Sequence, residues 1–149
     1  MGYRNRWRFR KFYFKQVDYI LALIKRKYSS TINDEQYLRM CEQLGEEPDL
    51  SKMPPSDSDF PLEVQLAFFI HSVMPDRWEG MSGHYLGKDW SSLEALLNIH
   101  EVEDKKTCVY FLKIIESYNS ESINRQIKQK QDATKRSGKA GKTVIGRKG

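Results

Sequence analysis

Apolar residues recur at helical spacing in several stretches of the chain, and no stretch alternates at period two for long enough to predict a strand. The first clear helix lies between Thr31 and Gly45. Its N-cap is Thr31 or Asn33, its stop signal is Gly45, and its apolar positions follow the i, i+3, i+4, i+7 pattern at Tyr37, Met40, Cys41 and Leu44. This pattern predicts one short amphipathic helix.

A second helix is expected after Pro61, which suits a first helical turn because its missing N–H would be unpaired there. Apolar residues continue on more than one face as far as Val73, and Pro75 follows Met74. We therefore expect this to be the most buried helix. His71 lies within it and has no second ligand four residues away, so a hydrogen-bonded histidine is favoured over a metal ligand.

The C-terminal half predicts two more core helices and a basic helix after them. Ser91 and Glu94 have the spacing of a capping box, S-x-x-E, ahead of a short helix that ends near residues 98–100. A fourth helix is expected from Glu103 or Asp104 to Tyr118, and beyond it a solvated basic helix with a narrow apolar stripe. The Gly/Lys/Arg-rich end from Ser137 is expected to be disordered when alone.

These elements predict an all-α fold, a small bundle of about four helices with a Gly/Trp-rich loop and basic terminal extensions. We expect a basic aromatic extension over residues 1–30, a helical core domain over 31–118, and a basic helix with a disordered tail over 119–149. The acidic, proline-containing connector 46–59 should cross the surface without regular structure.

Charge is sorted into three blocks. Residues 1–30 hold nine Lys/Arg against one acid, residues 31–107 hold six against sixteen, and residues 108–149 hold ten against three, which together give the net +5. Basic ends of this kind favour an anionic partner.

The first block interleaves arginine and lysine with aromatic residues. Cations neutralise phosphates and aromatic rings stack on unpaired bases, so the mixture suits nucleic acid. It suits an anionic membrane surface or an acidic protein equally well, and the segment is otherwise an extension without a role. The candidate anion-binding residues here are Arg4, Arg6, Trp7, Arg8, Arg10 and Lys11.

The third block supplies further candidates for binding nucleic acid or another anion. These residues are Arg125, Lys128, Lys130, Lys135 and Arg136.

The loop between the second and third helices, residues 76–90, combines glycines with two tryptophans, a composition typical of binding loops. Its candidate partner-binding residues are Arg77, Trp78, Tyr85, Lys88 and Trp90. The alternative is that its aromatic residues fold back to cover the helices.

No enzyme is expected, because the three histidines lack metal-ligand spacing and no serine lies in a nucleophile elbow. Catalysis would require Glu79, His84 and Asp89 to converge. GHYLGKD and the later Gly-Lys-Thr both lack the glycine and hydroxyl positions of a phosphate-binding loop. We therefore expect no cofactor and no metal.

Cys41 and Cys108 occupy apolar helical positions and are expected to be reduced. The longest apolar run, residues 19–24, falls far short of the roughly 20 residues of a membrane span. Reduced cysteines favour a cytoplasmic protein, and the short apolar run means that no transmembrane helix is expected.

Three phrases resemble a group of small proteins of marine tailed bacteriophages. They are DEQYLRMCEQLGEEPDLSKMP (34–54), SDFPLEVQLAFFI (58–70) and DRWEGMSGHYLGKDWSSL (76–93). The group shows the patterns YL-x-x-CE-x-LG-x-EPD-x-x-K-MP, DFP-x-EVQ-x-AF and W-E-G-M-S-G-x-Y-x-GKDWSS, followed by a basic tail that ends in glycine. The match covers most of residues 34–115 and brings no catalytic residues with it.

The resemblance implies a protein made in a bacterial host cytoplasm during infection, possibly within the virion. We expect a non-enzymatic accessory protein, in which a helical protein-interaction module has basic ends that bind an anion, most simply DNA or RNA. The protein partner would act in phage assembly or host takeover. The alternative is a minor virion or tail-assembly component whose arms are ordered by neighbouring subunits.

Overall fold

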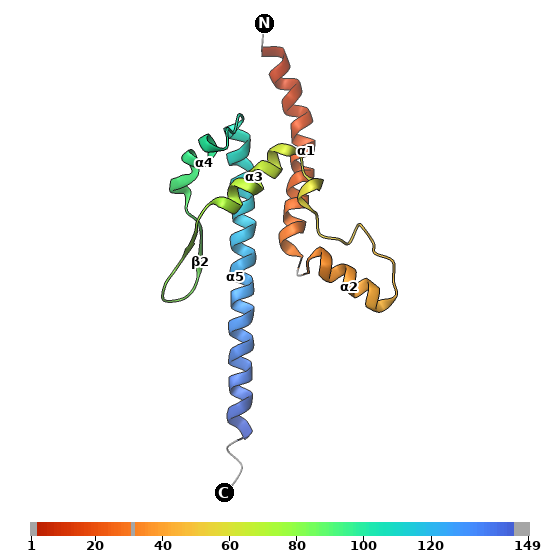
Figure 1. Ribbon diagram of the computed structural model, residues 1–149, viewed down its shortest axis with the longest axis vertical. Coiled ribbons are helices and arrows are strands. Elements are labelled where there is room, and N and C mark those ends of the chain that lie inside the picture. Colours follow the sequence, from red (N-terminus) through yellow and green to blue (C-terminus); the bar gives the residue numbers. More distant parts are fainter. Residues whose placement is uncertain (1–2, 31, 145–149) are drawn as a thin grey trace.

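The computed structural model describes the backbone of residues 3–30 and 32–144, and the side chains of residues 16–30 and 32–138. The fold is mostly helical, as predicted, and its longest helices are α1 (Tyr3–Ser29) and α5 (Lys105–Val144). Figure 1 shows the two reaching away from the middle of the molecule towards opposite ends. A short helix, α3 (Leu62–Val73), lies between them.

The core forms where α3 packs against α5 and α1 packs against α5. Four of its side chains, Val64 and Ile70 from α3 with Leu112 and Ile115 from α5, are wholly buried. Burying each aliphatic side chain contributes about 1.5–3 kcal/mol, so these contacts are the main source of stability in the part of the fold that holds the hairpin.

The core begins earlier than the expected boundary at Thr31. Ile20 and Ile24, one helical turn apart in the second half of α1, belong to the same cluster, and Ile24 is fully buried. Residues 1–30 are therefore not wholly an extension, because an i, i+4 apolar pair on this helix completes the core.

The helix predicted before Gly45 is confirmed as α2 (Asp34–Leu44). Asn33 accepts the N–H of Gln36 in a capping box, and Gly45 ends the helix with φ 68°. Tyr37 and Cys41 are buried, whereas Met40 and Leu44, which were expected on the same apolar face, are exposed.

The connector after α2 is irregular except for one turn of 3-10 helix, Asp57–Asp59. It is tied to the end of α1, because Arg26 donates to the carbonyl of Met53 at 2.6 Å and Lys27 contacts Asp57 at 2.8 Å. These bonds explain why an irregular acidic segment keeps a defined path.

The expectation of a purely α-helical bundle of about four helices is correct only in part, because within the described part of the chain residues 3–29 form a fifth helix, α1, and the fold also contains a small sheet. Strands β1 (Asp76–Trp78) and β2 (Tyr85–Lys88) form an antiparallel hairpin within the loop that follows α3. Strands of three and four residues are too short to show a period-two pattern, and a lone hairpin is only marginally stable in water. In this fold the hairpin is stabilised by contacts between β2 and α5, and it lies beside that helix in Figure 1.

The predicted capping box at Ser91 and Glu94 is not formed. Instead Asp89 accepts the N–H of Ser91 at 3.0 Å and starts a 3-10 turn, Trp90–Ser92, which leads into α4 (Leu93–Ile99). Asp89 lies two residues upstream of the expected cap and provides the carboxylate that an N-terminal turn favours.

The fourth predicted helix and the basic helix after it are one continuous element, α5. Asp104 accepts the N–H of Thr107 at 3.1 Å at its start. The helix continues past Ser137 as far as Val144, because each added residue gains a backbone hydrogen bond without new nucleation. Residues 145–149 of the expected tail lie outside the described part of the chain.

None of the helices in the described part of the chain is both long and apolar enough to cross a membrane.

Candidate functional site

The buried polar side chains of the described residues, His71, Lys88 and Glu116, lie where the hairpin meets α3 and α5. At the tip of the hairpin, the Glu79 N–H donates to the carbonyl of His84 at 2.8 Å, and the Glu79 carboxylate accepts the N–H of Ser82. Hydrogen bonds from the hydroxyl of Ser82, and from its backbone N–H, lower the pKa of Glu79. Gly83 closes the turn with φ 67°, a value that favours glycine.

A buried carboxylate, Glu116 of α5, connects three elements. One oxygen, Oε2, lies 2.5 Å from Nε2 of His71 on α3. The other, Oε1, accepts the backbone N–H of Lys88 on β2 at 2.9 Å and the Ser120 hydroxyl at 2.8 Å. Glu116 therefore fixes the hairpin to the two central helices.

His71 is confirmed as a hydrogen-bonded core histidine. Its burial lowers the pKa, and this effect outweighs the opposing hydrogen bond and negative charge of Glu116. The neutral imidazole therefore donates Nε2–H to the carboxylate at neutral pH.

A second group of polar side chains lies at the base of the hairpin. Lys88 forms an ion pair of 2.8 Å with Asp76, and the Tyr85 hydroxyl donates to the same carboxylate oxygen at 2.9 Å. The hydrogen bond from Lys88 is the main reason why the pKa of Asp76 is lowered. Burial and the bond to Asp76 raise the pKa of Tyr85, so it stays protonated as a donor.

Asn124 of α5 binds the backbone of the hairpin with both ends of its amide. Its Oδ1 accepts the N–H of Tyr85 at 3.0 Å, and its Nδ2 donates to the Tyr85 carbonyl at 3.1 Å. This pairing fixes residue 85, and with it His84, beside a defined turn of α5.

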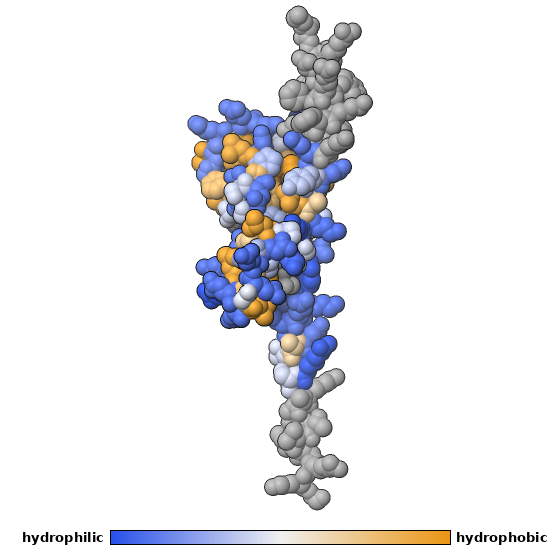
Figure 2. All heavy atoms as spheres, turned by 90° about the vertical axis from the view of Figure 1, so that its right-hand side faces the viewer, coloured by the Kyte–Doolittle hydropathy of each residue, from blue (hydrophilic) through white to orange (hydrophobic). Residues whose placement is uncertain are grey.

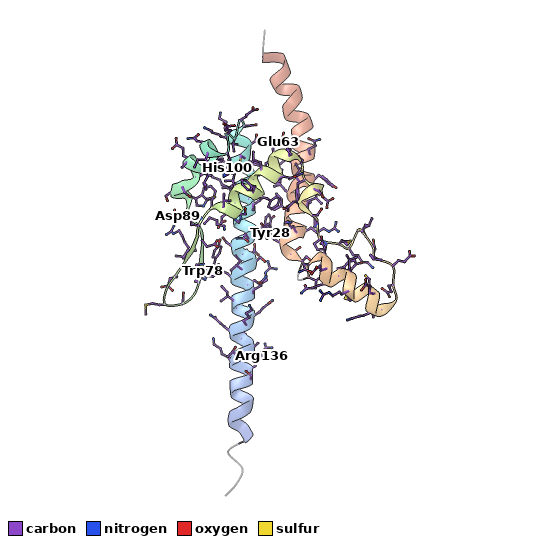
Figure 3. All side chains as sticks on the ribbon, in the orientation of Figure 1. Tyr28, Glu63, Trp78, Asp89, His100 and Arg136 are labelled. Atoms are coloured by element: carbon purple, nitrogen blue, oxygen red, sulfur yellow. The ribbon has the colours of Figure 1, made fainter. Side chains whose placement is uncertain are left out.

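The five predicted partner-binding residues of the loop differ in their exposure to solvent. Arg77 and Trp78 are exposed, and Figure 3 shows Trp78 on the hairpin. Tyr85 and Lys88 are buried in the network just described, and Trp90 is half-buried against the core. The last three residues therefore stabilise the fold, and only Arg77 and Trp78 of the five remain exposed for a partner.

The predicted anion-binding residues of the N-terminal block cannot be placed in the same way. Arg4, Arg6, Trp7, Arg8, Arg10 and Lys11 lie on the backbone of α1, and their side chains are outside the described set. The five predicted anion-binding residues of the C-terminal block are all exposed on α5; they are Arg125, Lys128, Lys130, Lys135 and Arg136. Figure 3 shows Arg136 well along this helix, past the hairpin.

The candidate catalytic residues do not converge. Glu79 and His84 are neighbours across the hairpin turn, but the Glu79 carboxylate is bound to Ser82 within that turn. Asp89 caps Ser91 at the other end of the hairpin. Among the described residues no group of three or more His, Cys, Asp or Glu side chains is arranged to hold a metal. Cys41 and Cys108 are both buried and free, and burial raises the pKa of Cys108.

Sequence reasoning missed Glu116 and Asn124, which hold the hairpin, and Asn119, whose amide donates to the Tyr85 hydroxyl at 3.4 Å. The available signal was an acid within the apolar stretch 109–118 of one helix together with a histidine within another apolar helix. Buried ionisable groups require partners, so such a combination indicates a pair. The two asparagines carry no comparable signal.

No family model matches the chain, and comparisons with curated proteins and with solved structures also gave no match.

Proposed function

We propose that this protein is a non-enzymatic accessory protein of a bacteriophage, whose helical domain presents a basic helix to nucleic acid. The observation that carries the proposal is the exposed half of α5. We define the stalk as residues 119–138; it holds five basic residues against Glu121 and Asp132, a net charge of +3. Figure 1 shows the lower part of α5 with no other element beside it, and Figure 2 shows its surface as mostly hydrophilic.

A solvated basic helix gains little from packing, since Ile123 and Ile127 are its only large apolar residues between 119 and 138. A nucleic acid would supply the negative charge that the fold does not place beside these lysines. Its phosphates would neutralise the lysines, and the counterions bound to the phosphates would be released. Binding of this kind depends steeply on salt.

The test compares two variants with the same change in net charge. One replaces Arg125, Lys128, Lys130 and Lys135 by Gln, and the other replaces Arg39, Lys52, Lys106 and Lys113, which are exposed elsewhere. Binding to labelled DNA and RNA is measured by fluorescence anisotropy between 50 and 300 mM salt. The stalk variant should bind more weakly, and its slope of log K against log salt should fall by about 0.9 for each phosphate that is no longer neutralised.

The control variant should bind like the wild type. Equal losses of affinity in both variants, or no binding by the wild type at low salt, would contradict the proposal. Neutralising Arg4, Arg6, Arg8 and Arg10 tests separately whether the N-terminal block contributes.

The phage setting rests on the resemblance of residues 34–115, and it places the protein in the host cytoplasm during infection. A second candidate function, a minor virion or tail-assembly component, is favoured by the two helices that reach towards opposite ends of the molecule. Arms of this form suit contacts with neighbouring subunits. Mass spectrometry of purified virions of the phage that carries this chain separates the two, since a stoichiometric amount in the particle supports assembly.

A further inference from the structure

The hairpin tip and the stalk together line an open groove of about 800 Å³. The hairpin contributes Ser82 and His84 to one wall. The stalk contributes Lys128 and Lys135 to the other wall, two helical turns apart. Lys130, on the same helix, does not line the groove.

The groove is lined by charges of both signs, and Arg125 lies in it together with Lys128 and Lys135. Glu121 and Asp132 also line it, and Glu121 lies 3.9 Å from Arg125 at an exposed position. Among the described side chains, neither Lys128 nor Lys135 forms an ion pair, and both are exposed. The two lysines and the His84 imidazole therefore offer N–H donors from both walls.

The two walls are held at a fixed spacing. Asn124 binds both backbone groups of Tyr85, the residue after His84, and Lys128 follows Asn124 by four residues on the same helix face. Glu116 fixes the other end of β2 through the Lys88 N–H. The groove is thus formed before any ligand arrives, and binding would not have to order the hairpin.

We propose that this groove holds one sugar–phosphate backbone of a nucleic-acid duplex, contacted by Lys128 and Lys135 from α5 and by His84 from the hairpin. The inference rests on the proposed function and adds a second contact element and a preferred form of nucleic acid. Among the described residues no Phe, Tyr or Trp lines the groove, and the stalk has none between residues 119 and 138, so the stacking that favours single strands is missing. A duplex instead offers the higher density of phosphate charge.

The experiment compares matched pairs of variants for binding to a 20-base-pair duplex and to one of its strands at 100 mM salt. The first pair is Lys128→Gln, inside the groove, against Lys130→Gln, outside it. Removing one phosphate contact lowers affinity roughly 5–10-fold at this salt concentration, so K128Q should weaken binding by that factor. K130Q removes the same charge from the stalk outside the groove and should weaken binding by a smaller factor. The second pair is His84→Ala against Met81→Ala, an exposed turn residue that does not line the groove. H84A should weaken duplex binding several-fold and M81A should not.

Cross-linking gives an independent readout on the full-length chain. Both native cysteines are buried, so a photoreactive group can be attached selectively to Ser82→Cys in the groove or to Gly80→Cys outside it. We expect duplex cross-links from position 82 and few from position 80.

Equal effects of K128Q and K130Q, with no effect of H84A, would overturn the groove while leaving binding by the stalk intact. Tighter binding of the single strand would overturn the preference for a duplex. Salt-sensitive self-association in gel filtration that K128Q abolishes, without any duplex binding, would assign the groove to a second copy and overturn both proposals.

Discussion

The carboxylate of Glu116 accepts the backbone N–H of Lys88 at 2.9 Å, so a side chain of a helix serves as the hydrogen-bond partner of a strand. The same residue is only 9% exposed and also contacts His71. A buried charge with three partners is costly to disturb, because removing any partner leaves a polar group unsatisfied. The position of the hairpin therefore depends on residues nearly thirty positions further along the chain.

Three glycines of the hairpin provide a graded test of this arrangement. A Cβ on Gly87, with φ 94°, would lie 2.5 Å from Oε1 of Glu116, whereas Gly83 has φ 67° with open space around it and Gly80 has neither constraint. Left-handed backbone costs a non-glycine residue about 1–2 kcal/mol, so Gly83→Ala should lower the free energy of unfolding by that amount. Gly87→Ala should cost more, and Gly80→Ala little. Urea denaturation measures the series, and equal losses of stability for Gly83→Ala and Gly87→Ala would contradict the contact with Glu116.

His71 should make stability dependent on pH below neutrality. Its pKa in the folded protein is lowered by burial, while in the unfolded chain it is about 6.5. As pH falls below about 6.5, the unfolded chain binds a proton that the folded chain does not, so the free energy of unfolding decreases. The groups that face the imidazole are Glu116, Lys88 and Asp76.

Thermal melts of the wild type between pH 7.5 and 5 should therefore show a falling midpoint. His71→Gln should flatten that dependence, and His100→Gln, at an exposed position, should leave it unchanged. A wild-type midpoint that rises on acidification would mean that the charged pair with Glu116 is favoured, contrary to this prediction. The lowered pKa of Asp76 adds a separate loss of stability that begins only below about pH 4.

Asn124 should tolerate no change in its hydrogen-bonding pattern. In Asn124→Asp the carboxylate still accepts the Tyr85 N–H, but its second oxygen faces the Tyr85 carbonyl and repels it. We expect stability to fall by about 1–3 kcal/mol, the cost of an unsatisfied, partly buried polar group. Gln126→Glu, exposed on the same helix, adds the same charge without this conflict and is the control. Chemical denaturation and amide exchange at Tyr85 report the difference, and identical behaviour of the two variants would contradict the pairing.

The contribution of α1 to the core can be measured with one pair of variants. Ile24→Ala empties a fully buried site and should cost about 2–5 kcal/mol. Tyr19→Ala removes a larger side chain that is 66% exposed and should cost much less. If both variants unfold at the same denaturant concentration as the wild type, α1 is not part of the core.

The helices that could be predicted from the sequence are those with local signals at both ends. Asn33 and Gly45 bracket α2, and Pro61 and Pro75 bracket α3, so each boundary depends on residues next to it. The start of α5 at Asp104 is a signal of the same kind.

The hairpin could not be predicted in this way, since its stabilising partners are distant. Asn124 lies 39 residues from Tyr85 and Glu116 lies 28 from Lys88. The loop composition correctly drew attention to residues 76–90, but it gave no means of separating the exposed Trp78 from the buried Tyr85. The share of α1 in the core was missed because the basic and aromatic residues before it dominate the composition of residues 1–30.

The bonds from α5 to β2 also have a consequence for association between molecules. β1 occupies one edge of β2, and the backbone groups of Tyr85 and Lys88 point from the other edge to Asn124 and Glu116. Unpaired strand edges are templates for the addition of further strands and so for aggregation. The helix therefore limits the sheet to two strands. Loss of the hydrogen bonds from Asn124 or from Glu116 would expose an edge of β2 to which strands of other molecules can add.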